Sequence, residues 1–460
     1  MNKIILKNLK ELTEPYPWRF MGFMVLIFLV PKLYELSNVY WIGRISFDAL
    51  AITEQYEFVA VSIEIVNETI PFGVLALIAQ NYLNKEKILS ILKAGLLVQI
   101  FFSSLLMSVV ILFIPEFVST IGTPSEIVET TKMYLILKSV ALPFESIAFL
   151  LLIGIKSMRK GKEALYLVLF SVILNIILDL FLISNQSFSL QLGIQGVAIG
   201  YIVAKISLMV ISVVYLGYIM EIKWLIFIKD TKFKHMFKPL FKIGGWTGLD
   251  SLTRNLGYIG LLIVLNVIGL NEFGGYGLAM WVMWTLIIPV LALAEGTNVA
   301  IGNLYGEKRF DEIRKVILTS MIFAFFTMSF IAALGIISWG GISRFFNPND
   351  SMIEYSVITF WWLIIPYMLL AFGLIIKSLF IGTGETRYIF YISLVGNAGI
   401  IAPFVLLART GIIPATYTSV MMLFFIVFVE DIIVTIFFAN RLSKRLSGRG
   451  LFAWKNLIVQ

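Results

Sequence analysis

Asn175 and Asp179 lie four residues apart in the apolar run Leu174–Ile183. If this run is helical, both side chains project from one face of the helix. Within a membrane, a carboxylate facing lipid costs ~3 kcal/mol or more, so Asp179 is expected to face protein or a water-filled cavity. Buried carboxylate and amide oxygens can bind a proton or a hard cation such as Na⁺. The alternative is that Asp179 only bonds a neighbouring helix.

Further acidic residues stand in apolar runs and could act together with Asp179. Glu64 and Glu68 are one helical turn apart, and Glu35 lies in the first apolar run. Because Glu35 follows Lys32 by three residues, it could instead only neutralise that lysine. We predict that Asp179 with Glu35, Glu64 or Glu68 forms an H⁺ or Na⁺ site, and that the protein uses no other cofactor.

In the second half of the chain, Glu295 is the strongest candidate for attracting a cationic ligand. Trp281 and Trp284 precede it and could stack on organic cations. The alternative for both tryptophans is an ordinary position at a membrane interface. Asp250 and Arg254 are spaced i and i+4, which predicts a charge-neutral pair within one helix.

The composition is that of a protein that crosses a membrane many times. Of 460 residues, 59% are hydrophobic and 14% are charged, with a mean hydropathy of +0.92. Soluble domains are usually ~25% charged and ~45–50% apolar. The absence of cysteine and the single histidine exclude disulfides, thiol catalysis and cysteine- or histidine-rich metal sites. Because no nucleophile–base pair or phosphate loop is present either, an enzyme is not expected.

A membrane span needs ~20 mostly apolar residues, and the sequence offers about twelve such runs. The predicted spans are 18–43, 53–82, 90–114, 127–153, 164–185, 192–219, 243–268, 274–304, 317–341, 352–380, 387–408 and 413–439.

The basic residues fall mostly in alternate loops between these spans, although the net charge is +8. This distribution follows the positive-inside rule and does not indicate nucleic-acid binding. We therefore expect a multi-pass protein of the plasma membrane with both termini in the cytoplasm.

The two halves of the sequence repeat one another. Ile155–Ser157, followed by Gly161, matches Ile376–Ser378, followed by Gly382. In the next span, Asn175 matches Asn397. Six spans per half, both halves starting inside, predict parallel repeats related by an axis along the membrane normal.

The predicted fold class is therefore an all-α polytopic membrane protein with twelve transmembrane helices in two pseudo-symmetric six-helix lobes. The position that matches Asp179 in the second half is apolar, near Ile401. This places the ion site in the first lobe only. The predicted domains are an N-lobe at 1–220, a cytoplasmic amphipathic linker at 221–242, and a C-lobe with a basic tail at 243–460.

Three stretches of the sequence resemble the multidrug and toxic compound extrusion (MATE) family. They are Leu33–Ala51, with its Gly-Arg and Ala-Leu-Ala; Leu174–Ile183 with Gly193–Gly200; and Ala292–Val316, with its recurrent glycines. The resemblance covers nearly the whole chain. It implies a V-shaped pair of bundles with a central cavity, which exports amphipathic, often cationic molecules and is driven by H⁺ or Na⁺.

The resemblance also implies roles for individual residues. In many relatives an Asp of the first span works with the Asn and Asp of the fifth, which Asn175 and Asp179 match. The first-span position is Asn38 here, and the sixth-span position, often Thr, is Tyr201. A seventh-span Glu of one branch corresponds to Asn255. Because the first-span Asp is replaced, Asp179 is expected to work with glutamates of the first two spans.

Taken together, these features predict a secondary active antiporter that exports amphipathic, cationic organic compounds in exchange for H⁺ or Na⁺. We expect a monomer in the lipid bilayer without a nucleic-acid partner. Na⁺, if used, would bind at Asp179 and Asn175. The substrate cavity would include Glu295, Trp281, Trp284, Asn255 and Asn397. The alternative is a flippase for a lipid-linked or amphipathic metabolite, which a cavity rich in basic residues would favour.

Overall fold

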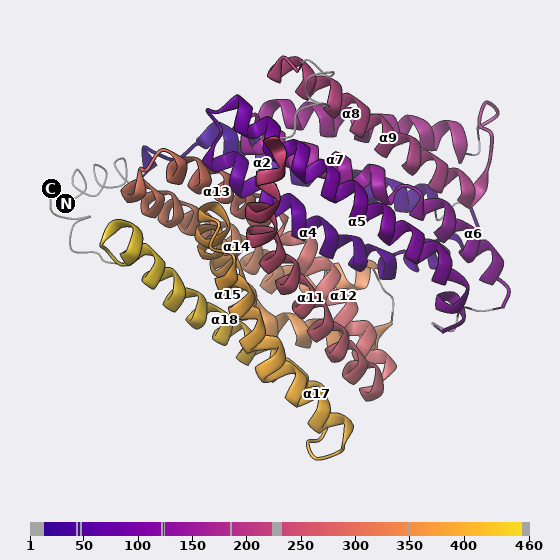
Figure 1. Cartoon of the computed structure of the whole chain (residues 1–460). Helices are drawn as coiled ribbons and strands as arrows, with labels where there is room; N and C mark the ends of the chain where they lie inside the picture. The colour runs from indigo at the N-terminus through magenta and orange to yellow at the C-terminus, as the bar shows by residue number, and fades with distance from the viewer. Residues whose placement is uncertain are drawn as a thin grey trace. The chain divides into compact units, whose positions relative to one another are not determined.

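A computed structural model describes residues 13–42, 45–46, 48–120, 123, 125–184, 186–222, 232–346 and 349–452. Throughout these ranges the chain forms helices joined by short loops, with no β-strand (Figure 1). The predicted all-α fold class is confirmed. Contacts between Cα atoms divide the chain into two compact units. We call Gly22–Gly248 the N-unit, and Met1–Met21 together with Leu249–Gln460 the C-unit.

The N-unit is built around α7. Its helices are α2 (Trp18–Ile42), α3 (Ala49–Glu54), α4 (Glu57–Gln80), α5 (Lys85–Thr120), α6 (Val128–Ser139), α7 (Leu142–Ser157), α8 (Gly161–Leu182), α9 (Gly193–Met220), η1 (Lys232–Met236) and the beginning of α11 (Phe237–Ile268). Helix α7 packs against α4, α5 and α9, and most of its residues are buried. Helices α8 and α9 lie side by side (Figure 1).

The C-unit has the same plan around α15. Its helices are the rest of α11, α12 (Leu270–Leu286), α13 (Ile288–Gly306), α14 (Phe310–Phe346), α15 (Asp350–Thr383), α16 (Arg387–Ser393), the π-helix η2 (Leu394–Ile401), α17 (Ala402–Arg409) and α18 (Tyr417–Ser447). Helix α15 packs against α13, α14 and α18, as α7 does against α4, α5 and α9. The equivalent spans of the two repeats therefore have equivalent neighbours.

Helices lie along all twelve predicted spans. Within the described ranges, nine helices or joined helix pairs are long and apolar enough to cross a membrane, or ten if α12 and α13 form one span bent by 48°. Helices α2 and α11, which lie along the first and seventh predicted spans, are outside that count. The bend follows Leu286, and Pro289 stands in the first turn of α13, where its missing N–H leaves no helical hydrogen bond broken.

The predicted boundaries of the lobes differ from the contact-based units. Of the described residues, 13–21 group with the C-unit, and the division falls between Gly248 and Leu249, inside α11. Residues 223–231 of the predicted linker, and 453–460 of the predicted basic tail, lie outside the described residues. The predicted lobe limits and linker therefore stay predictions.

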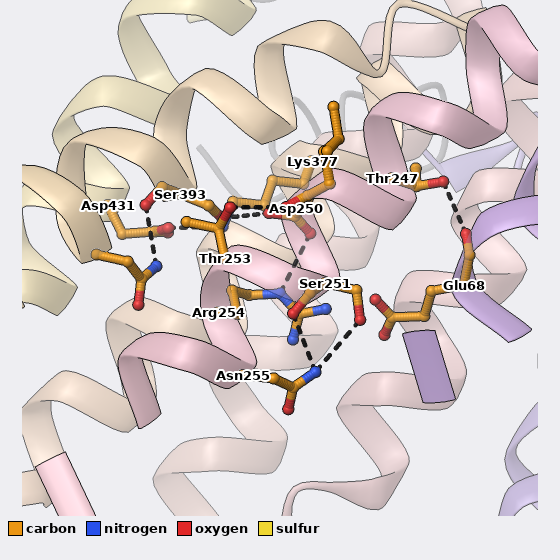
Figure 2. Close-up of polar contacts among 12 residues, drawn as sticks. Glu68, Thr247, Asp250, Ser251, Thr253, Arg254, Asn255, Lys377, Ser393 and Asp431 are labelled. Carbon is orange, nitrogen blue, oxygen red and sulfur yellow. Dashed lines mark hydrogen bonds and ion pairs between the residues drawn. The ribbon is translucent and has the colours of Figure 1, made fainter. Parts of the chain in front are cut away.

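Glycines let the beginning of α11 approach α4 closely within the N-unit. A Cβ at Gly244 would lie 2.2 Å from the backbone oxygen of Thr69, and one at Gly248 would lie 2.3 Å from the Thr69 hydroxyl oxygen. Between the two glycines, the hydroxyl of Thr247 donates a hydrogen bond of 2.7 Å to the backbone oxygen of Glu68 (Figure 2). No side chain larger than hydrogen fits at Gly244 unless one helix moves.

Gly244→Ala is therefore expected to destabilise the protein by about 1–3 kcal/mol, because overpacking forces a backbone shift. Gly245→Ala is the matched control, since a Cβ there meets no atom within 4 Å. It should be neutral or stabilising by up to ~1 kcal/mol, the helix-propensity gain of alanine over glycine. Midpoints of thermal unfolding in detergent would measure both variants. Equal midpoints for the two would contradict the close approach of α4 and α11.

Candidate functional site

Asp179 lies on α8 inside the N-unit, and the residue is only 3% exposed. The hydroxyl of Tyr34, on α2, donates a hydrogen bond of 3.0 Å to one carboxylate oxygen of Asp179. Asn175 lies one turn earlier on the same helix and is 6% exposed. The apolar helix α8 thus carries one buried polar face, with Tyr34 of another helix beside its carboxylate.

Asn38 follows Tyr34 by one turn of α2, so the two side chains share a face of that helix. Its amide oxygen is buried and has no hydrogen-bond partner among the residues that the structure describes. A buried acceptor without a donor is costly, so this oxygen is available to a ligand that carries a proton or a positive charge.

The predicted glutamates are more exposed than Asp179. Glu35 is exposed and forms an ion pair with Lys32. This pairing is the alternative role that the sequence analysis gave for Glu35. Glu64 is exposed and Glu68 is half-buried, both on α4. The group that contacts Asp179 from the first span is therefore Tyr34, which the sequence analysis did not single out.

Tyr201, on α9, contacts a different carboxylate. Its hydroxyl donates a hydrogen bond of 2.6 Å to Glu145 of α7, and the ammonium of Lys205 lies 3.0 Å from the same oxygen. Lys205 and Glu145 are about equally shielded, with side chains 23% and 21% exposed. Because Tyr201 and Lys205 are spaced i and i+4 on α9, they reach Glu145 from the same helix face.

A polar cluster in the C-unit is centred on Asp250 of α11. Arg254 donates a hydrogen bond of 3.2 Å to its carboxylate, which confirms the predicted pair within one helix. The hydroxyl of Ser393, on α16, donates to the other carboxylate oxygen. Figure 2 shows Asp250 between these two donors. The charge of Asp250 is thus neutralised within the C-unit.

The two asparagines predicted for the cavity bond their own helices. Asn255 donates a hydrogen bond of 3.0 Å to the backbone oxygen of Ser251 (Figure 2). Asn397 donates one of 2.9 Å to the backbone oxygen of Ser393. Asn397 lies in the π-helix η2, and a Cβ at Gly257 would lie 2.1 Å from its amide oxygen. Such π-helical turns often occur at functional sites.

A second ion pair crosses the C-unit from α15 to α18. The ammonium of Lys377 lies 2.6 Å from the carboxylate of Asp431, and the two side chains are 14% and 18% exposed (Figure 2). Its neighbour Glu430 has both carboxylate oxygens buried without a hydrogen-bond partner in the described parts of the chain. The buried acids of the C-unit are thus not all neutralised.

The remaining predicted cavity residues are dispersed over the C-unit. Glu295 is 8% exposed on α13. Trp281 and Trp284, on α12, are each 45% exposed. Their rings pack against Phe346 and Tyr367, with centroids 5.1 and 6.3 Å apart. These contacts show two tryptophans in aromatic surroundings and do not place them around Glu295.

The sequence analysis missed Tyr34, Lys205, Ser393 and the Lys377–Asp431 pair as partners of the acids. The i, i+4 spacing could have identified two of them as neighbours of predicted site residues. Tyr34 is four residues before Asn38, and Lys205 is four residues after Tyr201. Spacing held no signal for Ser393, which is 143 residues from Asp250.

Comparison with known proteins supports one family across both units. The family model MatE matches residues 24–181 and 248–407. The probable multidrug resistance protein YoeA of Bacillus subtilis is 24% identical over 326 residues, which cover 66% of this chain and 68% of YoeA.

Solved structures share the fold. A mutant of the MATE transporter VcmN from Vibrio cholerae has a TM-score of 0.83 at 17% identity, over 99% of this chain and all of that one. An outward-facing multidrug resistance MATE family transporter of the MOP superfamily has a TM-score of 0.81 at 17% identity, over 93% of this chain and 95% of that one. The predicted family and two-lobe fold are confirmed.

Proposed function

The chain belongs to the MatE family of multidrug transporters, and on this premise we propose that it is a secondary active antiporter that exports amphipathic, cationic organic compounds in exchange for H⁺ or Na⁺. Members of this family are membrane transporters and not enzymes. The coupling ion binds in the N-unit, at Asp179.

The observation that carries this proposal is the buried Asp179 carboxylate and its contact with the Tyr34 hydroxyl. A buried carboxylate on an apolar membrane-spanning helix is rare because it is costly, and such acids usually mark the path of an ion or a substrate. It can take up a proton directly. It can also hold Na⁺ through its own oxygens and the amide oxygen of Asn175, because hard cations prefer oxygen ligands.

Tyr34 connects this site to a second helix. Its hydroxyl donates to Asp179 when the carboxylate is ionised, and it can rotate to accept when the carboxylate carries a proton. Binding of the ion to Asp179 would therefore change the contact between α2 and α8. An antiporter needs such a link, because ion binding must favour one arrangement of the helices over another.

The cationic substrate class is supported by the acids of the C-unit. Glu295 is buried, and both oxygens of Glu430 lack a hydrogen-bond partner in the described ranges. The paired acids contribute no net negative charge, because Lys377 neutralises Asp431 and Arg254 neutralises Asp250. Glu430 is therefore the acid of this unit whose charge is best placed to attract an organic cation, and Glu295 is the candidate that the sequence analysis singled out.

Reconstitution into lipid vesicles tests the proposal. A pH gradient and an Na⁺ gradient are imposed separately, and the movement of a panel of organic cations is followed, with organic anions of similar size as controls. When one of the two ion gradients is imposed, we expect the organic cations to move against their own concentration gradient. The organic anions should not be transported. Movement that depends on neither gradient would contradict the antiporter, and movement of anions alone would contradict the substrate class.

A further inference from the structure

Three tyrosines surround the ammonium of Lys138 in the N-unit. Lys138 is at the end of α6, and its nitrogen lies 3.8 Å from the ring centroid of Tyr56, 5.1 Å from that of Tyr201 and 5.5 Å from that of Tyr134. Tyr56 and Tyr134 are only 5% and 1% exposed. We call Tyr56, Tyr134 and Tyr201 the tyrosine cage.

A cage of this kind is a binding site for cations in general. The face of an aromatic ring attracts a positive charge within ~6 Å of its centroid, and all three rings meet that distance. Such aromatic cages recognise quaternary ammonium ligands, which cannot donate hydrogen bonds. The tyrosine cage therefore has the chemistry to hold an organic ammonium in place of the lysine.

Glu145 adjoins the tyrosine cage through Tyr201. Glu145 accepts a hydrogen bond of 2.6 Å from the cage residue Tyr201, and it also lies within electrostatic range of Lys138. Its other partner is Lys205, at 3.0 Å. Because Lys205 neutralises Glu145, a cation inside the tyrosine cage meets three ring faces and, beside them, an ion pair without net charge.

The cage lies where four helices of the N-unit meet. Tyr56 directly precedes α4, Tyr134 and Lys138 lie on α6, Tyr201 lies on α9, and Glu145 beside it lies on α7. Just beyond Lys138 the span breaks at Val140 and Ala141, between α6 and α7.

We propose that the tyrosine cage binds the ammonium group of the exported compound and that Lys138 is a built-in competitor for the same place. The proposal rests on the cationic substrate class proposed above. Lysine carries its charge on a flexible four-carbon stem, so Lys138 can leave the cage when a substrate enters and return when it departs. When Lys138 returns to the cage, it expels the substrate. An exporter needs this step because it must release the substrate into a medium in which the substrate is already present.

Competition lowers the apparent affinity, because the substrate finds the cage open for only part of the time. Removing the lysine ammonium should therefore tighten binding. Lys138→Met is expected to bind radiolabelled tetraethylammonium about tenfold more tightly than the natural protein, in equilibrium binding to purified protein in detergent. Lys138→Gln serves as a second variant if Lys138→Met does not fold.

Two controls separate the cage from a general effect of charge. Lys138→Arg keeps a cation that fits an aromatic cage and should retain the natural affinity. Lys132→Met removes a charge from the same helix, where Lys132 pairs with Glu129 at 2.8 Å, and should also change nothing. Tighter binding in Lys132→Met as in Lys138→Met would overturn the proposal.

The rings are tested in the Lys138→Met protein. Adding Tyr56→Leu should cancel the tenfold gain, whereas adding Tyr56→Phe should keep it, because phenylalanine preserves the ring face. In vesicles, Lys138→Met should lower both KM and the maximal rate, since release becomes slower. Unchanged or weaker binding of tetraethylammonium by both Lys138→Met and Lys138→Gln would show that the cage is only structural.

This experiment is independent of ion coupling, because equilibrium binding in detergent requires no gradient. Tighter binding by Lys138→Met, in a protein that moves cations with neither gradient, would support the cage and contradict the antiporter. Gradient-driven export with unchanged binding in both Lys138 variants would contradict the cage and support the antiporter.

Discussion

Asp179→Asn is expected to reduce gradient-driven export to the background of empty vesicles. Asparagine has nearly the same size as aspartate and can still accept the hydrogen bond from Tyr34, so the contact between α2 and α8 can remain. It cannot carry the negative charge that a proton or Na⁺ neutralises. The measurement is the uptake of a fluorescent organic cation into reconstituted vesicles under a pH gradient and under an Na⁺ gradient.

Glu35→Gln is the matched control for this variant. It makes the same change from acid to amide in the N-unit, but on an exposed side chain that pairs with Lys32. An exposed ion pair contributes little, about 0–1 kcal/mol, so this variant should transport at nearly the natural rate. If Asp179→Asn instead keeps both its activity and its ion dependence, Asp179 is a buried acid that only bonds a neighbouring helix.

Lys377→Met is expected to lower the free energy of unfolding by somewhat less than the ~3–5 kcal/mol of a fully buried ion pair, because this pair is partly buried. Removing one partner of a buried ion pair leaves the other charge without compensation in a medium of low dielectric constant. The carboxylate left behind would be that of Asp431, beside the already unpartnered Glu430 on α18. Unfolding in mixed micelles, followed by tryptophan fluorescence, measures the change.

Two further variants make this prediction specific. Lys85→Met breaks the pair with Glu221, whose side chains are 58% and 80% exposed, and should cost about 0–1 kcal/mol. Lys377→Met combined with Asp431→Leu should recover most of the loss, because two apolar side chains can replace a buried pair without penalty. Equal losses for Lys377→Met and Lys85→Met would mean that water compensates Asp431.

The sequence determined the membrane class, the positions of the helices and the duplication. Apolar runs of ~20 residues can satisfy their backbone hydrogen bonds in lipid only as helices, so each predicted span had one available structure. The match of Ile155–Ser157 to Ile376–Ser378 places a lysine on the central helix of each unit: Lys156, which is buried, and Lys377, which is partly buried. The Asp250–Arg254 pair was predictable because both residues lie on one helix.

The tertiary structure alone decided which side chains meet across helices. Lipid and protein interior are both apolar, so hydrophobic periodicity reveals little about the rotation of a transmembrane helix. Tyr34 and Glu35 are consecutive residues of α2. Tyr34 contacts Asp179, whereas Glu35 is exposed beside Lys32. The sequence therefore identified Asp179 as a candidate site, and the packing of helices supplied its partner.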